Sequence, residues 1–193
     1  MVKSIGLTGS IGSGKTLICS VFEHLGIPIF NADKEAKECY NDLSFLNEIE
    51  KEFGSGVVKE GKLFKEKLAN IVFNNKESLK KLNGMIHPKV LSRYLVWKEE
   101  QQSKYVIHES AILFESGWNK YFDKIICINS PLDIIYQRVM QRDNLSKEEI
   151  DARLKNQMPI EEKLRLSDYI INHDNTTMLL PQILKIHSEL IKE

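Results

Sequence analysis

GSIGSGKT, residues 9–16, fits the phosphate-binding pattern G-x-x-x-x-G-K-[S/T] at every defined position. Residues 3–8 before it are typical of a short buried strand, and residues 16–25 after it are typical of a helix that Gly26 ends. Glycines let successive backbone N–H groups face an anion, and the positive end of the following helix points at the same place. This stretch therefore predicts a strand, loop and helix that bind a nucleoside triphosphate.

Two side chains of the loop add chemistry to the backbone cradle. Lys15 supplies a mobile positive charge for the β- and γ-phosphates, and the hydroxyl of Thr16 can hold Mg²⁺. We therefore expect Mg²⁺ as the cofactor.

The composition narrows the class of protein. The chain has 193 residues, enough for one domain with a sizeable core, and its 27 Lys and Arg balance its 27 Asp and Glu. This balance argues against nucleic acid or a membrane surface as the main partner. The three cysteines are far apart and form no C-x-x-C, which favours reduced thiols over a zinc site. With no apolar run of membrane-spanning length and no signal-peptide pattern, we expect a cytoplasmic protein.

Strand and helix patterns alternate along the chain. Strand character is found at residues 27–30, 105–109, 124–128 and 169–171, whereas residues 34–103 show almost none. Strands separated by helices indicate an α/β fold with a parallel sheet, whose ligands bind at the carboxyl ends of the strands. Asp33, Glu109 and Asn172 follow strands and are therefore candidate site residues.

Several helix starts can be read from the sequence. Residues 130–133 (SPLD) and 146–149 (SKEE) each predict a capping box, and a final amphipathic helix is expected from about residue 178. Pro88 suits the first turn of a helix, with His87 before it either as a cap or as a contact with substrate.

Two acidic candidates have alternative explanations. Asp33 could accept a proton from an acceptor hydroxyl or help to position the metal, or it could be the N-cap of a helix that starts at Lys34. Glu109 could lie near Mg²⁺ through water, or it could be a solvated strand end.

Arg138 and Arg142 are four residues apart and share one helix face, and Arg153 and Gln157 repeat this spacing. Guanidinium groups that close over a triphosphate would stabilise the charge of the transferring group. The alternative is a surface of ion pairs, because acidic residues such as Asp143 lie nearby in the sequence.

The chain resembles the dephospho-coenzyme A kinases over residues 5–175. Residues 6–16 (GLTGSIGSGKT) are similar to the opening motif of that family, and residues 31–33 (NAD) resemble its D-A-D, whose second Asp is Asp33 here. Four further motifs in the family order are found at residues 86–88 (IHP), 109–115 (ESAILFE), 137–143 (QRVMQRD) and 166–172 (LSDYIIN).

The resemblance implies transfer of the γ-phosphoryl group of ATP to the ribose 3′-hydroxyl of dephospho-CoA, the last step of coenzyme A synthesis. It implies a P-loop NTPase three-layer fold with a five-stranded parallel sheet in one domain, residues 1–193. The core would be residues 1–33 and 104–193, the acceptor-binding helical insert about 34–103, and the lid about 138–158. An insert that only packs on the sheet is the alternative.

The resemblance also implies roles for individual residues. Asp33, Lys15, Arg138 and Arg142 would be catalytic, and the metal would lie at Thr16, with Asp33 and Glu109 as further candidates. ATP would bind Ile11, Gly12, Ser13, Gly14, Lys15, Thr16, Leu17, Arg142 and Asn172. The acceptor would bind Thr8, Asp33, Lys37, His87, Phe114 and Glu115. The chain departs from the family pattern at Asn31, Lys37, Ala111 and Asn172.

Two other functions are compatible with a phosphate loop. One is a kinase for another small acceptor, such as a nucleoside monophosphate or shikimate. The other is a nucleotide-dependent switch, which would need N-K-x-D and D-x-x-G motifs that this sequence lacks.

Overall fold

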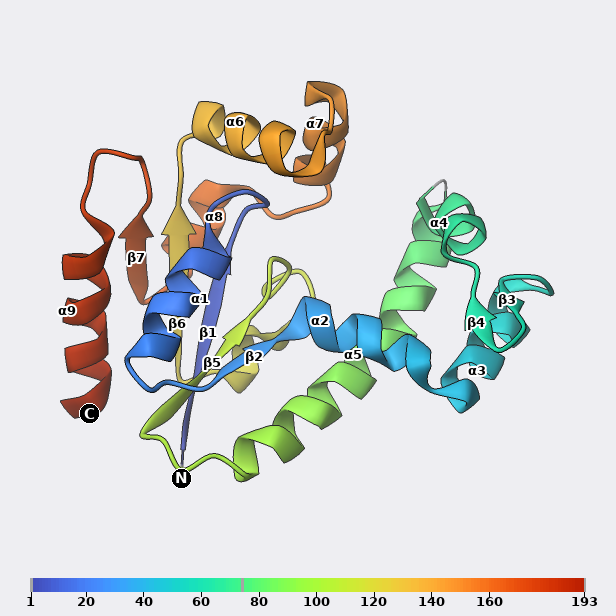
Figure 1. Ribbon diagram of the computed structural model, residues 1–193, viewed down its shortest axis with the longest axis horizontal. Coiled ribbons are helices and arrows are strands. Elements are labelled where there is room, and N and C mark those ends of the chain that lie inside the picture. Colours follow the sequence, from blue (N-terminus) through green and yellow to red (C-terminus); the bar gives the residue numbers. More distant parts are fainter. Residues whose placement is uncertain (1, 74, 193) are drawn as a thin grey trace. The chain divides into compact units, whose positions relative to one another are not determined.

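The computed structural model describes residues 2–73 and 75–192 and divides the chain into two compact units. The first unit comprises Met1–Asn31 and Lys98–Glu193, and the second comprises Ala32–Trp97. Each unit is described by itself below, with the element labels of Figure 1.

A five-stranded parallel sheet forms the centre of the first unit, with strand order β2-β5-β1-β6-β7. This confirms the predicted α/β fold with a five-stranded parallel sheet. The strands are β1 (Lys3–Gly9), β2 (Ile29–Asn31), β5 (Tyr105–Glu109), β6 (Lys124–Asn129) and β7 (Tyr169–Asn172).

The two faces of the sheet are covered by different segments, which gives three layers. On one face, Ile5 and Leu7 of β1 pack in a core with α1 (Lys15–His24) and α9 (Leu179–Lys192). The other face is covered by α8 (Ile160–Arg165) and the segment before β6. Gly6 faces this second layer so closely that an added Cβ would lie 2.6 Å from Cδ1 of Leu113.

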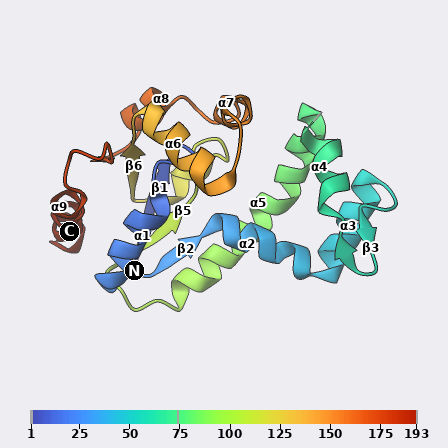
Figure 2. The same cartoon turned by 45° about the horizontal axis from the view of Figure 1, so that its top comes forward.

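Helices α6 (Leu132–Asp143) and α7 (Lys147–Lys155) lie beyond the carboxyl ends of β1 and β6 (Figures 1 and 2). Ser146 forms the predicted capping box with Glu149 at the start of α7. The capping box predicted at Ser130 is wrong. Its hydroxyl instead donates to the carbonyls of Ser13 and His173, which tie the phosphate loop to β7, so α6 starts without a side-chain cap.

The second unit is mostly helical, as its lack of strand pattern predicted, but it contains a short hairpin that the sequence did not reveal. Its elements are α2 (Ala32–Glu38), η1 (Cys39–Asn41), α3 (Leu43–Phe53), β3 (Val58–Lys59), β4 (Lys62–Leu63), α4 (Lys65–Phe73) and most of α5 (Lys76–Glu99).

Pro88 lies inside α5 and does not begin a helix, so that prediction is wrong. Proline in a helix interior costs about 3 kcal/mol. The buried side chains of Leu82, Ile86, Val90 and Tyr94 lie on both sides of it at helical spacing, and their burial outweighs that cost.

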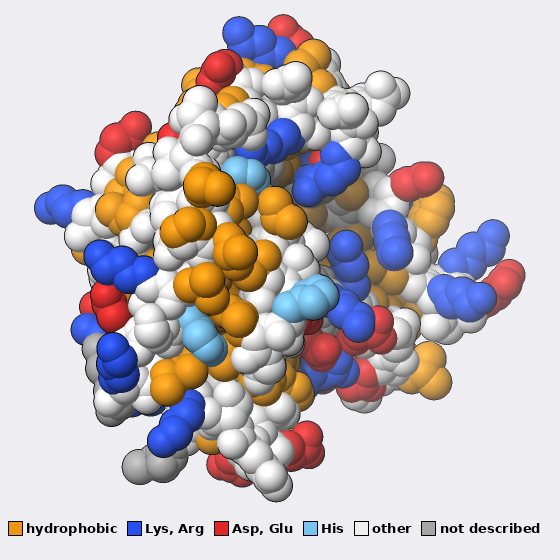
Figure 3. All heavy atoms as spheres, turned by 60° about the vertical axis from the view of Figure 1, so that its left-hand side comes forward, with side chains coloured by type: hydrophobic (Ala, Val, Ile, Leu, Met, Phe, Trp, Pro, Cys, Tyr) orange, Lys and Arg blue, Asp and Glu red, His pale blue; other side chains and the backbone are white. Residues whose placement is uncertain are grey.

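Figure 3 views the first unit from the side of α9, where hydrophobic side chains gather in the middle of the face. The exposed ones on α9 include Leu180, Leu184 and Ile191. Within residues 2–73 and 75–192, none of the helices combines the length and the apolar character that crossing a bilayer requires.

The acid stability of the fold should depend on His108, which is fully buried in β5 between Phe30 and the rings of Trp118 and Phe122. Burial lowers the pKa of His108 from 6.5 to about 3. Below pH 6.5 the unfolded chain therefore binds a proton that the folded chain does not, so stability falls as the pH falls. Between pH 7 and pH 5 this group should remove about 2 kcal/mol of folding free energy.

Urea unfolding of the protein and of His108→Leu at both pH values measures this effect. The variant should lose correspondingly less stability over the interval, and an equal loss in both proteins would contradict the assignment.

Candidate active site

The phosphate loop joins β1 to α1 with a backbone that needs glycine. Gly12 and Gly14 have φ values of +74° and +95°, which side chains of L residues rarely adopt. Ser13 is buried between them, whereas Thr16 and Leu17 are exposed in the first turn of α1. Nζ of Lys15 lies 3.2 Å from each of the carbonyl oxygens of Gly9 and Ser10. The loop therefore presents backbone, a hydroxyl and a positive charge in one place.

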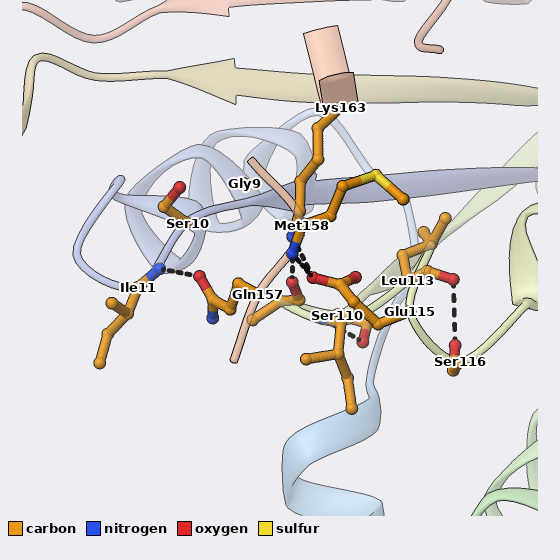
Figure 4. Close-up of polar contacts among 12 residues, drawn as sticks. Gly9, Ser10, Ile11, Ser110, Leu113, Glu115, Ser116, Gln157, Met158 and Lys163 are labelled. Carbon is orange, nitrogen blue, oxygen red and sulfur yellow. Dashed lines mark hydrogen bonds and ion pairs between the residues drawn. The ribbon is translucent and has the colours of Figure 1, made fainter. Parts of the chain in front are cut away.

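Helix α6 and the residues after α7 pack directly on this loop. An added Cβ on Gly12 would lie 2.5 Å from Cγ2 of Val139, and Ile11 packs against a core of Ile135, Val139 and Ile150. The backbone N–H of Ile11 donates to Oε1 of Gln157 at 3.1 Å (Figure 4). The expected lid segment thus contacts the phosphate loop through both apolar and polar groups.

The structure brings Arg138 to the phosphate loop. Its Nη1 lies 3.0 Å from Nδ1 of His173 and 3.5 Å from the carbonyl oxygen of Ser13, and its Nη2 donates to Oδ1 of Asn175 at 2.6 Å. Burial lowers the pKa of Arg138. The guanidinium group is therefore held beside the loop by a ring nitrogen, an amide oxygen and a carbonyl oxygen, and its charge is available to an anion.

Arg142 has a different environment, in which it forms an ion pair, as the alternative interpretation of this segment expected. Its Nε and Nη2 donate to the carboxylate of Asp143 at 2.7 and 2.8 Å, and Nη1 of Arg153 lies 3.9 Å from the same carboxylate. Hydrogen bonds from Arg142 lower the pKa of Asp143, which in turn raises the pKa of Arg142. To reach a nucleotide, Arg142 has to exchange Asp143 for phosphate oxygens.

Glu109 and Asn172 lie at the carboxyl edge of the sheet. Glu109 is only 4% exposed and accepts a hydrogen bond from Asn31, so its interpretation as a solvated strand end is wrong. Asn31 departs from the aspartate of the family pattern, and its amide can donate where an aspartate could not. Asn172 accepts from Nδ2 of Asn129 at 3.0 Å, and its backbone is bonded to Gln182.

The candidate acceptor residues fall in both units. In the first unit, Thr8 is fully buried in β1, and its hydroxyl has no hydrogen-bond partner within the described parts of the chain. In the second unit, Asp33 and Lys37 are exposed on α2. Because α2 begins at Ala32, Asp33 lies in the first helical turn and is not the N-cap. His87 lies inside α5 and caps no helix, and burial lowers its pKa.

Phe114 and Glu115 have roles within the fold of the first unit. Phe114 packs with Leu113 and Ile125, and Glu115 contacts the fully buried Lys163. Nζ of Lys163 lies 2.9 Å from Oε1 of Glu115 and donates to the carbonyl oxygen of Ala111 at 2.7 Å.

The same Oε1 atom accepts from the backbone N–H of Met158 at 2.7 Å (Figure 4). Since Met158 follows Gln157, the pair of Glu115 and the buried Lys163 anchors the end of the segment that holds Ile11. We call the contacts from Lys163 through Glu115 to Met158 the brace.

The two halves of the brace should differ in their effect on stability. Among the described residues, Glu115→Ala leaves the buried Lys163 with the carbonyl of Ala111 as its remaining polar contact, and it should cost about 3 kcal/mol. Lys163→Met should cost less, because the Glu115 side chain is 20% exposed and can be hydrated. Chemical unfolding of both variants measures the difference, and equal losses would show that the charge of Lys163 is not the deciding factor.

His173, Lys163 and Ser130 were not recognised as site residues from the sequence. His173 directly follows β7, so the rule that ligands bind at the carboxyl ends of strands could have identified it. Lys163 gave no such signal, since EEK in a short helix is typical of a solvated surface.

Comparison with known proteins shows the family to which the sequence is similar. The family model described as Dephospho-CoA kinase matches residues 3–178. A relative named dephospho-CoA kinase from Fusobacterium nucleatum is 38% identical over 172 residues, covering 89% of each chain. One with the same name from Aquifex aeolicus is 34% identical over 196 residues, covering 100% of each chain.

Solved structures give the same result. A crystal structure of a Thermus thermophilus protein is 32% identical and superposes with a TM-score of 0.88, covering 98% of each chain. Dephospho-CoA kinase from Campylobacter jejuni is 33% identical with a TM-score of 0.72, covering 100% of this chain and 98% of that one. A shikimate kinase from Bacteroides thetaiotaomicron, at 20% identity and a TM-score of 0.51, shares the fold alone. This chain belongs to the dephospho-CoA kinase family.

Proposed function

We propose that this chain transfers the γ-phosphoryl group of ATP to the ribose 3′-hydroxyl of dephospho-CoA and releases CoA and ADP. The observation that carries the proposal is the complete phosphate loop in a chain whose residues 3–178 match the family model. The two relatives named dephospho-CoA kinase align with this chain over 89% and 100% of their own length. The three cysteines are buried and free, which fits a reducing, cytoplasmic setting.

Different residues of the phosphate loop would contact different parts of the nucleotide. Backbone N–H groups of residues 12–16 would face the phosphates, and Lys15 would release the carbonyls of Gly9 and Ser10 to reach the transferring group. Arg138 and then Arg142 would neutralise charge on the side of α6, with residues 138–158 acting as the lid. Leu17 and Asn172 would contact other parts of ATP.

Oxygen ligands are available for Mg²⁺, which prefers them. The hydroxyl of Thr16 lies in the exposed first turn of α1, and the carboxylate of Glu109 lies at the end of the neighbouring β5. In the described parts of the chain no three His, Cys, Asp or Glu side chains gather as a metal site. This fits an ion held mainly by Thr16, phosphate oxygens and water. When bound, Mg²⁺ would neutralise charge on the phosphates.

Asp33 would be the base for the acceptor. Its carboxylate is exposed at the start of α2, two residues after β2 ends. The 3′-hydroxyl would give its proton to this carboxylate while its oxygen bonds to the γ-phosphorus, and the bond from that phosphorus to ADP would break. Helices of residues 34–103, with Lys37 and His87, would hold the rest of the acceptor, together with Thr8, Phe114 and Glu115.

An acceptor panel tests the proposal. Purified protein with ATP and Mg²⁺ should release ADP with dephospho-CoA, but not with CoA, whose 3′-position is already phosphorylated. Adenosine monophosphate and shikimate should give no more than background. Faster turnover of either of these than of dephospho-CoA would refute the proposed acceptor.

Arg142→Ala should lower kcat by about 10²-fold and change ATP binding much less, because its contact with phosphate would form in the transition state. The effect should be smaller than that of a preorganised arginine finger, since Arg142 is 61% exposed and first has to leave Asp143. Steady-state kinetics with varied ATP measure both quantities. Arg165→Ala is the control, and a normal kcat for Arg142→Ala would leave this residue with the ion-pair role alone.

A further inference from the structure

His173 is fixed against the phosphate loop by its own backbone. Its N–H donates to the carbonyl oxygen of Asn129 at 2.8 Å, and its carbonyl accepts from the hydroxyl of Ser130 at 3.0 Å. A Cβ added to Gly14 would overlap the His173 ring. The ring therefore occupies the space that the absence of a side chain at position 14 leaves open.

One ring nitrogen of His173 lies within hydrogen-bond distance of both the loop and Arg138. Nδ1 lies 2.8 Å from the carbonyl oxygen of Ser13 and 3.0 Å from Nη1 of Arg138. A carbonyl only accepts and a guanidinium only donates, so each tautomer of the ring serves one of the two. With its proton on Nδ1 the ring holds Ser13, and with its proton on Nε2 it holds Arg138. Nδ1 is thus within hydrogen-bond distance of both the loop and α6, and the tautomer decides which of the two it bonds.

The carbonyl of Ser13 controls where an N–H group of the loop points. In a planar trans peptide the C=O of one residue and the N–H of the next point in opposite directions. His173 and the hydroxyl of Ser130, which donates at 3.1 Å, hold the Ser13 oxygen on one side. The N–H of Gly14 is therefore held on the other side, as one of the donors with which such a loop and its helix start bind phosphate.

The turn after His173 reinforces the arrangement. Asp174 accepts hydrogen bonds from the backbone N–H groups of Thr176 and Thr177, which lower its pKa. This turn places the side chain of Asn175 on Nη2 of Arg138. The position of the guanidinium is thus set by groups of one short segment.

We propose that His173 is a positioning residue of the kinase, and that its Nδ1 orients the Ser13–Gly14 peptide in one tautomer and the Arg138 guanidinium in the other. It would act through these groups and touch neither substrate. The proposal rests on the proposed function to the extent that the loop binds ATP.

Three substitutions at His173 distinguish the effect of a polar atom at the Nδ1 position from the effect of side-chain size. His173→Phe keeps a ring and removes the nitrogen. His173→Asn places an amide close to the Nδ1 position, where it can donate to Ser13 or accept from Arg138. His173→Gln places its amide near the Nε2 position instead. His24→Phe, on the exposed end of α1, is the matched control.

Two measurements are made on each protein: ADP affinity by calorimetry without acceptor, and kcat and KM for ATP with dephospho-CoA. His173→Phe should weaken ADP binding about tenfold and lower kcat about tenfold, the usual cost of losing a hydrogen bond to a charged group. His173→Asn should recover to within about threefold of the parent, and His173→Gln should not. The control should behave as the parent.

Parent-like binding and turnover in His173→Phe would overturn the proposal, as would equal values for the Asn and Gln variants. If the parent fails to phosphorylate dephospho-CoA, the proposed function is refuted. The order of ADP affinities still tests His173 in that case, because calorimetry needs no acceptor.

Discussion

Lys15→Met should lower kcat for phosphoryl transfer by about 10⁴-fold and leave the fold intact. Lys15 is the one loop residue whose charge can follow the γ-phosphoryl group, and losing a charged donor aimed at developing charge costs more than losing a neutral one. In the structure its Nζ contacts the loop carbonyls of Gly9 and Ser10, so its removal takes little from the hydrophobic core. ADP release measures the change in kcat, and thermal unfolding measures whether the fold is intact.

Lys192→Met, at the end of α9, is the control for loss of a lysine. It should leave kcat and the melting temperature unchanged. A folded Lys15→Met protein that works at the parent rate would show that the loop does not hold the transferring phosphate.

Asp33→Asn should lower kcat by about 10²–10⁴-fold, because the amide cannot take the proton of the acceptor hydroxyl. Stability should change by less than about 1 kcal/mol. The substitution removes a carboxylate from the first turn of α2, where it interacts favourably with the helix dipole, but it removes no cap. Initial rates with dephospho-CoA at saturating ATP measure the effect.

Asp133→Asn makes the same chemical change in the first turn of α6 and serves as the matched control. It should keep the parent rate. Full activity in Asp33→Asn would remove Asp33 as the base and would require another group to accept the proton.

The sequence predicted the sheet well, because strands buried on both faces are short apolar runs that differ clearly from helices. It predicted the phosphate loop because the motif fixes backbone shape as well as chemistry. Predictions from local sequence patterns were wrong where contacts with residues far away in the sequence determined the structure. Ser130 has the pattern of a cap, yet the carbonyls of Ser13 and His173 take its hydroxyl. Pro88 has the pattern of a helix start, yet apolar packing continues α5 through it.

The candidate site depends partly on contacts that the sequence does not show. Lys15 belongs to the phosphate-loop motif, whose defined positions lie within eight residues, and the resemblance to the family indicated Arg138. The contact of His173 with Ser13 joins residues 160 positions apart, and the pairing of Lys163 with Ala111 joins residues 52 apart. Nothing in the spacing of a single sequence encodes such pairs.

The complete burial of Lys163 makes this side chain a reporter of conformational opening. An amine-reactive mass tag added to the folded protein should label exposed lysines quickly and Lys163 only when α8 detaches from the sheet. The labelling rate of this one amine, followed by peptide mass spectrometry, would give the free energy of that local opening in the native protein. A nucleotide that tightens the contact between Gln157 and Ile11 should slow it.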